Sequence, residues 1–295
     1  MNYQFMENHL GTYGVEKMAK VLSVSRSGYY AWIERPPSAR ECQKVELTEQ
    51  IREIQHQMHH RYGAPRVTRE LVRRGRSVGH NRVARILREK DLGARPKKRF
   101  RVTTRSAEGP VVASNELDRH FSAAAVNQKW VSDITYVATA EGWLYLCVIV
   151  DLYSRRVVGW SMGTSLATEL VTAAFMMAVM RRRPPRGLMF HSDRGTQYAS
   201  RAFRKGLARH GMLQSMSRKG ECWDNACAET FFKTLKTELI GQRIYRTREE
   251  AKAAIFEYVE VFYNRVRLHS YLGYVPPAEF EELDSERVAS LTCRR

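Results

Sequence analysis

The order of apolar segments after Trp130 restricts the fold of this chain more than any other feature. The predicted strands are 129–139, 141–151, 154–162, 187–193 and 212–217. The predicted helices are 168–183, which ends at Pro184–Pro185, 200–210 and 224–239. Three strands in a meander, followed by alternating helices and strands, indicate an α/β domain with a mixed five-stranded sheet flanked by helices.

The N-terminal part predicts helices only. Residues 15–34 contain two short amphipathic segments with turn residues at Ser23–Ser25, although Gly28 interrupts the second. This pattern is typical of a helix-turn-helix, and equally of a plain helical hairpin. Residues 45–58 predict an amphipathic helix that is too short for a coiled coil. A second helix-turn-helix candidate follows, interrupted at 75–79, and its polar faces are mostly arginine.

Basic residues are concentrated in one part of the chain. The formal net charge is +18, and the segment 61–105 holds 16 basic and three acidic residues, or +13 of that excess. Clustered arginine and lysine favour a nucleic acid partner, with phosphates contacted first, although a solvated basic face is the simpler alternative. The predicted DNA contacts are Arg66, Arg69, Arg73, Arg82 and Arg85 on the helices, and Arg95, Lys97, Lys98 and Arg99 on an extended arm.

Several protein classes are disfavoured by length and composition. A chain of 295 residues is long enough for about two domains with real cores. The apolar runs are too short to span a bilayer, and the N-terminus lacks a signal-peptide pattern. Five irregularly spaced cysteines point to a reducing cytosol. No nucleotide-binding glycine motif is present, so we expect a cytoplasmic protein that is not a nucleotide-driven motor.

Three acidic residues occupy positions where carboxylates can do chemistry. Asp133 lies inside an apolar strand, Asp193 ends the strand at 187–193, and Glu229 lies on the last helix of the domain. If they converge, their oxygens suit Mg²⁺ or Mn²⁺, and two ions about 4 Å apart can promote phosphodiester displacement. Taken singly, each acid is also explained as an ion-pair partner or a cap. Asp151, as a turn residue, and Asp224, as an N-cap, are rivals that the pattern does not exclude.

Five motifs then carry a resemblance to a known family. They are WVSDITY (130–136), YLCVIVDLYSRRVVGW (145–160), FHSDRGTQY (190–198), SMSRKGECWDNACAETFFKTLKTE (215–238) and YNRVRLHSYLGYVPPAEF (263–280), with 35 residues between Asp193 and Glu229. The chain resembles the IS-three family of bacterial insertion-sequence transposases, and specifically the product of the second reading frame. The resemblance implies an integrase catalytic core with the RNase H-like fold, preceded by all-α helix-turn-helix modules.

The resemblance also implies roles for individual residues. Asp133, Asp193 and Glu229 become the catalytic and metal-binding acids, with two Mg²⁺ ions, or Mn²⁺ as the alternative. Asp151 and Asp224 then become structural. The flanking residues His191, Gln197 and Asn225 would support the site or contact DNA near the scissile phosphate. Lys233 and Lys236, on the same helix face as Glu229, would hold the DNA end. Further backbone contacts are expected at Arg155, Arg156 and Arg218.

The implied reaction is DNA transposition by strand cleavage and 3′-hydroxyl strand transfer. Its partners are double-stranded DNA, both the terminal repeats and the target, and other copies of the chain on that DNA, in a bacterial, nucleoid-associated setting. An upstream-frame product is expected as a fusion partner, because no sustained heptad pattern is present. Two alternatives are a non-catalytic DNA-binding regulator that needs this partner and a generic RNase H-like nuclease. The predicted regions are an N-terminal helix-turn-helix (1–40), a basic module and arm (41–105), a linker (106–128), the catalytic core (129–240) and a helical tail (241–295).

Overall fold

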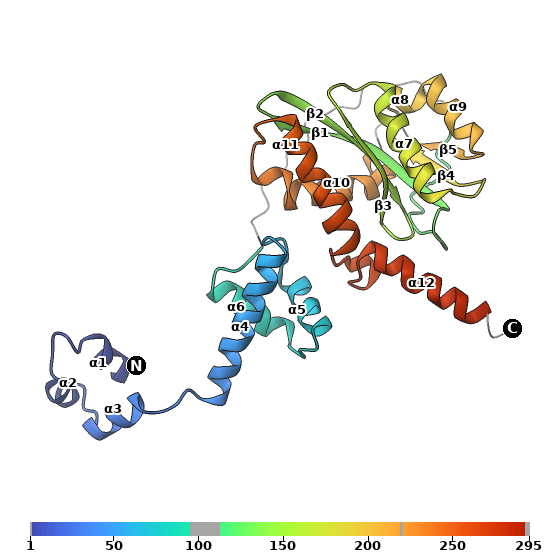
Figure 1. Cartoon of the computed structure of the whole chain (residues 1–295). Helices are drawn as coiled ribbons and strands as arrows, with labels where there is room; N and C mark the ends of the chain where they lie inside the picture. The colour runs from blue at the N-terminus through green and yellow to red at the C-terminus, as the bar shows by residue number, and fades with distance from the viewer. Residues whose placement is uncertain (1, 95–112, 219–220, 293–295) are drawn as a thin grey trace. The chain divides into compact units, whose positions relative to one another are not determined.

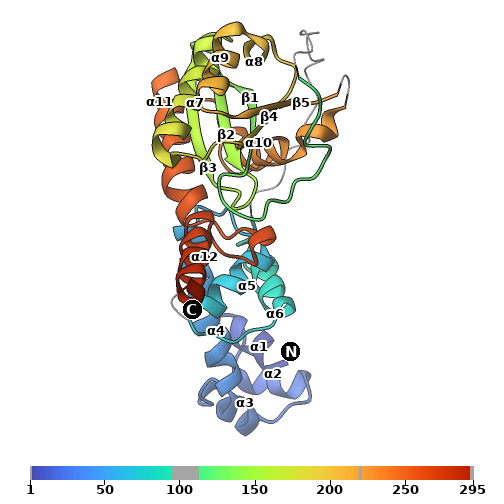
Figure 2. The same ribbon diagram turned by 90° about the vertical axis from the view of Figure 1, so that its right-hand side faces the viewer.

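The computed structural model describes residues 2–94, 113–218 and 221–292. The chain divides into two compact units, Met1–Gly93 and Ala94–Arg295. The first is helical, and the second is built around one sheet (Figures 1 and 2). In the described residues no helix has both the length and the apolar character that crossing a bilayer requires.

The first three helices share a small core. They are α1 (Asn2–Asn8), α2 (Val15–Val21) and α3 (Arg26–Ile33), packed around Met6, Met18, Ala19 and Tyr29. The helices predicted within 15–34 are confirmed as α2 and α3, and Ser25 caps α3 by accepting a hydrogen bond from the Gly28 amide at 3.2 Å. Gly28 is explained by packing, because a Cβ there would lie 2.4 Å from the hydroxyl oxygen of Tyr3. Tyr3 lies on α1, a seven-residue helix that the sequence did not predict.

Three further helices complete the first unit. They are α4 (Ala39–Gln57), α5 (Ala64–Arg73) and α6 (His80–Glu89). The helix α4 begins six residues before the predicted start at Val45, because Ser38 and Glu41 form a reciprocal capping box. The apolar faces are buried as predicted, with Ile51 of α4, Leu71 of α5 and Val83 of α6 each at most 1% exposed.

The second unit contains the predicted five-stranded sheet, in the order β3-β2-β1-β4-β5. The strands are β1 (Lys129–Thr139), β2 (Gly142–Asp151), β3 (Val157–Gly163), β4 (Met189–Ser192) and β5 (Leu213–Met216). The first three form an antiparallel meander, and β4 and β5 run parallel to β1. Ser132 of β1 is therefore paired with Ser192, the last residue of β4.

Helices α7 (Thr168–Arg182), α8 (Thr196–Ala199) and α9 (Arg201–Arg209) build the larger core on one face of the sheet. Trp130, Phe175, Phe190 and Phe203 are among its buried members. The helix α7 approaches β3 so closely that a Cβ on Gly159 would lie 2.3 Å from the Ala174 carbonyl oxygen. Glycine at this position is required by the close packing of helix and strand.

The helix α10 (Ala226–Glu238), which carries Glu229, packs against β1 and β2 after the short 3₁₀ turn Cys222–Asn225. The remaining elements are a 3₁₀ turn at Ile240–Gln242, α11 (Arg248–Phe256), a π-helix at Glu257–Tyr263, a 3₁₀ turn at Ser270–Leu272 and α12 (Pro277–Thr292). The end of α10 is fixed by a buried ion pair between Glu238 and Arg267 at 2.8 Å. Tyr258 donates a further hydrogen bond to Glu238 at 2.8 Å.

Candidate active site

Asp133 lies in the middle of β1, the central strand of the sheet. Since side chains alternate along a strand, its carboxylate is on the face opposite Ser132 and Ile134, toward α10. The backbone amide of Ile134 donates to its Oδ1 at 2.8 Å. Burial raises the pKa of Asp133 well above its usual value, and the negative charge of Asp193 raises it further. Two carboxylates from neighbouring parallel strands therefore lie close enough to repel each other.

Asp193 is the first residue after β4. The amide of Gly195 donates to Asp193 Oδ1 at 3.0 Å, and burial raises the pKa of this carboxyl as well. A Cβ on Gly195 would lie 3.0 Å from that same oxygen. The absence of a side chain at 195 thus lets the chain turn tightly around the carboxylate.

Glu229 faces this pair from the first turn of α10. Its charge is a further cause of the raised pKa of Asp133, which places Glu229 in the electrostatic range of the pair. Glu229 is nevertheless an exposed residue. Its carboxyl group is partly buried, and this burial raises the pKa of Glu229. Within the described residues, no three acidic, histidine or cysteine side chains form a ready metal-binding group. The metal-site prediction required the carboxylates of Asp133, Asp193 and Glu229 to lie together. In this conformation the three side chains do not form one group.

Lys236 is a basic side chain whose charge acts on Asp133, and it lies two turns after Glu229 on α10. Its positive charge opposes the rise in the pKa of Asp133, while burial lowers the pKa of Lys236 itself. Its Nζ lies 5.7 Å from the centre of the Tyr136 ring, which in turn packs edge-on against Trp143. Lys233, one turn earlier, is exposed. Tyr136 was not foreseen, because its partner Lys236 lies a hundred residues away in the sequence.

The three residues expected to support the site have distinct surroundings. Asn225 is buried and donates from Nδ2 to the Ser132 carbonyl oxygen at 3.1 Å, next to Asp133. Gln197 donates to the Leu166 carbonyl oxygen at 2.9 Å, which connects α8 to the loop before α7. His191 is fully buried, with ring nitrogens 2.8 Å from Ser215 Oγ and 3.2 Å from Ser217 Oγ. Burial lowers the pKa of His191 to about 4, so this neutral side chain fixes β4 to β5 through the two serines.

Asp151 closes a turn, as its alternative interpretation predicted. Its carboxylate accepts from the amide of Tyr153 at 2.8 Å, from the amide of Asn127 at 2.7 Å and from Nε1 of Trp130 at 3.2 Å.

The N-cap interpretation of Asp224 was wrong. Asp224 lies inside the 3₁₀ turn before α10 and accepts from Arg119 Nε at 2.9 Å and from the Arg218 amide at 2.9 Å. It anchors the loop before α10, because its buried carboxylate meets two arginines.

Arg155, Arg156 and Arg218, which were expected to contact the DNA backbone, each form contacts within the second unit. Arg155 is buried, donates to the sulfur of Cys227 at 2.7 Å and stacks on Tyr271. Arg156 pairs with Glu281 of α12 at 2.6 Å. Arg218 pairs with Asp224 and also with Asp118. All three hold parts of the second unit together.

The basic helices of the first unit differ in how their charges are balanced. On and after α5, Arg74 pairs with Glu70 at 3.0 Å, and Arg76 pairs with Glu46 of α4 at 2.6 Å. Arg66 stacks over Tyr62, while Arg69 and Arg73 are exposed. On α6, neither Arg82 nor Arg85 forms an ion pair within the described part of the chain, and Arg85 is exposed. The arm residues Arg95, Lys97, Lys98 and Arg99 lie outside the described residues.

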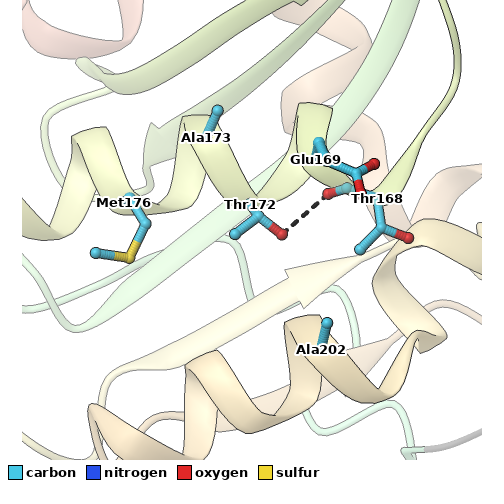
Figure 3. Close-up of a pocket in the computed structure, with 6 residues that line it drawn as sticks. All are labelled: Thr168, Glu169, Thr172, Ala173, Met176 and Ala202. Atoms are coloured by element: carbon cyan, nitrogen blue, oxygen red, sulfur yellow. Dashed lines mark hydrogen bonds between the residues drawn. The ribbon is translucent and has the colours of Figure 1, made fainter.

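An open hollow of about 380 Å³ lies between α7 and α9, and none of Asp133, Asp193 and Glu229 lines it (Figure 3). It is lined by Thr168, Glu169, Thr172, Ala173, Met176 and Ala202. The hydroxyl of Thr172 is turned along the helix and donates to the Thr168 carbonyl oxygen at 2.9 Å. One carboxylate and no basic side chain face this hollow, so it lacks the groups that phosphodiester chemistry needs.

Comparisons with known proteins agree with this arrangement. Family models described as integrase core domains match residues 123–222 and 229–284, and one described as an HTH-like domain matches residues 43–100. The transposase InsF for insertion sequence IS3A of Escherichia coli (strain K12) is 42% identical over 288 residues, covering 95% of this chain and 98% of the relative.

Two further proteins are similar. An uncharacterized 31 kDa protein of insertion element IS600 from Shigella sonnei is 44% identical over 265 residues, covering 90% of this chain and 97% of the relative. Among solved structures, the HTLV-2 integrase catalytic core domain in complex with magnesium, in its trimeric form, aligns with a TM-score of 0.41 at 16% identity. That alignment covers 54% of this chain and 98% of the other.

Proposed function

The chain belongs to the transposase family of insertion sequence IS3, and on that premise we propose that Asp133, Asp193 and Glu229 catalyse its DNA strand cleavage and strand transfer. The observation that carries the proposal is the pairing of Asp133 and Asp193. Burial raises the pKa of Asp133, the charge of Asp193 at the end of the adjacent parallel strand raises it further, and the charges of Glu229 and Lys236 act on it from α10. Clustering of like charges is costly for a fold and is typical of a site that binds a cation.

The donor set fits a divalent metal, on which the integrase core family depends. Carboxylate oxygens are the ligands that Mg²⁺ prefers, with Mn²⁺ as an alternative. Two such ions, when bound, would polarise the reacting phosphodiester and stabilise the attacking and leaving oxygens. Asp133 and Asp193 would hold the shared position between β1 and β4, and Glu229 would complete the ligand set from α10. Binding would remove the repulsion that the two aspartates now experience.

The proposed reaction has two chemical steps of the same kind. In the first, water attacks the phosphorus at the 3′ end of the element, the P–O bond breaks, and a 3′-hydroxyl leaves. In the second, that hydroxyl attacks a second phosphodiester in line and displaces a new 3′-hydroxyl, as in a copy-out type of transposition. Neither step requires a covalent link between protein and DNA. Lys236, with Lys233 one turn away, would bind the phosphates of the DNA end beside the carboxylates.

We propose that the HTH-like domain provides part of the DNA-binding surface and that its helices contribute unequally to phosphate binding. The glutamates of α4 and α5 neutralise Arg74 and Arg76, whereas Arg82 and Arg85 of α6 keep their charge available for phosphates. Arg66, Arg69 and Arg73 of α5, and the arm residues Arg95, Lys97, Lys98 and Arg99, would add contacts. Assembly of several copies on the terminal repeats, and joining to an upstream-frame product, are further parts of the proposal.

A nicking and strand-transfer assay tests the proposed function. The substrate is an end-labelled duplex with the element's terminal repeat, and wild type is compared with Asp193→Asn and with Glu169→Gln, an exposed carboxylate on α7. We expect cleavage by wild type and Glu169→Gln in Mg²⁺, and no cleavage by Asp193→Asn or by any form in EDTA. Tight DNA binding without cleavage by wild type would instead support the DNA-binding regulator.

A further inference from the structure

Ser132 is a polar residue in the middle of the buried sheet, immediately before Asp133. It is 0% exposed, and its neighbours on the same face of β1, Trp130 and Ile134, pack into the main hydrophobic core. A hydroxyl in such surroundings costs free energy unless it is fully hydrogen-bonded. If residue 132 served only to pack the core, alanine or valine would fill the position at a lower cost in desolvation free energy.

The Ser132 hydroxyl is fully hydrogen-bonded. Its Oγ lies 2.9 Å from the Val148 carbonyl oxygen of β2, to which it donates, and 2.8 Å from the hydroxyl oxygen of Tyr198. Since its single proton is used by Val148, the Tyr198 hydroxyl must be the donor in the second bond. Cys147 Sγ is a weak third neighbour at 3.6 Å.

Tyr198 connects this hydroxyl to the segment that carries Asp193. It lies in α8, is 1% exposed, and its amide donates to the Gly195 carbonyl oxygen at 3.0 Å. The amide of the same Gly195 donates to Asp193 Oδ1 at 3.0 Å. A short chain of hydrogen bonds therefore runs from Ser132 to one catalytic carboxylate.

The backbone of Ser132 connects to the segment that carries Glu229. Its carbonyl oxygen accepts from Asn225 Nδ2 at 3.1 Å, and Asn225 directly precedes α10. Asn225 is 5% exposed, and its Oδ1 has no hydrogen-bond partner among the described residues. The bond to Ser132 is thus the contact that orients this amide, four residues before Glu229.

We propose that Ser132 is a positioning residue that sets the three carboxylates relative to one another. It precedes Asp133 on β1, is bonded through its side chain to the Asp193 segment, and is bonded through its backbone to the Glu229 helix. This inference rests on the proposed function. Among the described residues, removing the hydroxyl would leave the Tyr198 hydroxyl with only the weak sulfur contact at 3.7 Å, and the loop around Asp193 would lose this connection to β1.

The test compares Ser132→Ala and Tyr198→Phe with wild type, and Ser161→Ala serves as the matched control. Ser161 lies on β3 at the sheet edge, and its hydroxyl also donates to a backbone carbonyl, that of Leu170. Because supporting hydrogen bonds around metal ligands typically change affinity by about 10–100-fold, we expect the Mn²⁺ concentration for half-maximal cleavage to rise at least tenfold in both test variants. Cleavage at saturating Mn²⁺ should stay within about threefold of wild type.

A second measurement does not depend on activity. Mn²⁺ binding to the DNA-free protein, followed by electron paramagnetic resonance, should weaken by the same factor in Ser132→Ala and Tyr198→Phe. The double variant should bind Mn²⁺ no more weakly than either single variant, because both substitutions remove the same hydrogen bond between Ser132 and Tyr198. Ser132→Thr keeps the hydroxyl and should restore binding, whereas Ser161→Ala should bind Mn²⁺ like wild type.

The outcomes separate the positioning inference from the proposed function. If wild type binds Mn²⁺ and cleaves, and Ser132→Ala does both at wild-type metal concentrations, the positioning role is overturned and the proposed function stands. If wild type neither binds Mn²⁺ nor cleaves, both are overturned. Ser132→Ala could also lose as much stability as Ser161→Ala while its Mn²⁺ dependence stays unchanged. The Ser132 hydroxyl would then contribute to stability alone, and this result would also contradict the inference.

Discussion

At the scale of single residues, what distinguishes the acids is how each charge is compensated. Asp224 accepts hydrogen bonds from two arginines, which balance its negative charge within the fold, and Asp151 accepts hydrogen bonds from two amides and Trp130, although burial still raises the pKa of Asp151. Asp133 and Asp193 each accept one backbone hydrogen bond and repel each other. A charge that the fold leaves uncompensated is available to bind a cation.

Asp224 should make stability depend on pH in the acid range. Burial alone would raise its pKa, but hydrogen bonds from Arg218 and Arg119 hold the pKa well below the usual value. Folding then gains stability above the unfolded pKa of about 3.9, and this gain is lost as the pH falls through the folded value. Asp224→Asn should lower the free energy of unfolding at pH 7 by about 2 kcal/mol.

Urea unfolding at a series of pH values checks this prediction. The difference in unfolding free energy between wild type and Asp224→Asn should narrow as the pH falls from about 5 toward 3, because Asp224 then binds a proton in the unfolded wild type while the folded carboxylate stays ionised. Glu282→Gln, an exposed carboxylate on α12, should show no such difference. If the difference in unfolding free energy between wild type and Asp224→Asn stays constant over this range, the stabilising role of the Asp224 charge is contradicted.

The sequence alone could not choose between these acids, for a physical reason. One hydrogen-bond donor to Asp224 is Arg119, about a hundred residues earlier in the sequence. Asp151 accepts a hydrogen bond from Trp130 on the neighbouring strand. No local pattern reports such contacts, and the choice of Asp133, Asp193 and Glu229 came from the family resemblance. Ser132 was missed for the same reason, since its partners Tyr198 and Asn225 become neighbours only in the folded sheet.

At the scale of elements, α6 and α5 should contribute differently to DNA binding. Arg85 of α6 is exposed, whereas Arg74 is paired with Glu70 and lies 3.8 Å from Glu53. Arg85→Ala should weaken binding to duplex DNA and reduce the slope of log K against log salt by about 1. Arg74→Ala should change the slope by much less. Fluorescence anisotropy over a salt series measures both, and equal slopes for the two variants would contradict the division between helices.

The packing of α7 on β3 gives a second prediction at this scale. Gly159→Ala would place a Cβ 2.8 Å from the Ala178 Cβ and closer still to the Ala174 carbonyl oxygen, so it should destabilise the unit by roughly 1–3 kcal/mol. Gly206→Ala on α9 is the control, since its Cβ would lie at an ordinary 3.5 Å from Phe175. That change should stabilise by about 0.5–1 kcal/mol. Thermal unfolding that ranks the two variants in the opposite order would be incompatible with this packing.

Periodicity predicted most elements because their apolar faces are simple. All five strands and the helices α7, α9 and α10 were predicted within a few residues of their observed bounds. The pattern failed where stability comes from tertiary contact. The helix α1 has one buried residue, Met6, and the π-helix at Glu257–Tyr263 is shaped by contacts such as that of Tyr258 with Glu238.

At the scale of the whole molecule, DNA binding and catalysis should be separable. The cations of α6 belong to the unit Met1–Gly93, and the carboxylates belong to Ala94–Arg295. Asp193→Asn should therefore bind duplex DNA within about twofold of wild type, with the same steep salt dependence. The double variant Arg82→Ala with Arg85→Ala should bind DNA weakly and still bind Mn²⁺. Loss of Mn²⁺ binding in that double variant would argue against separate sites.

The most direct test of the central claim, that these carboxylates hold a divalent cation for strand cleavage, is a ligand replacement at Asp193. Thiolate is a poor ligand for Mg²⁺ and a better one for softer ions such as Mn²⁺. Single-turnover cleavage by Asp193→Cys should be abolished in Mg²⁺ and recover to about a tenth or more of the wild-type rate in Mn²⁺. Cleavage by Asp193→Cys in Mg²⁺ at the wild-type rate would contradict the account.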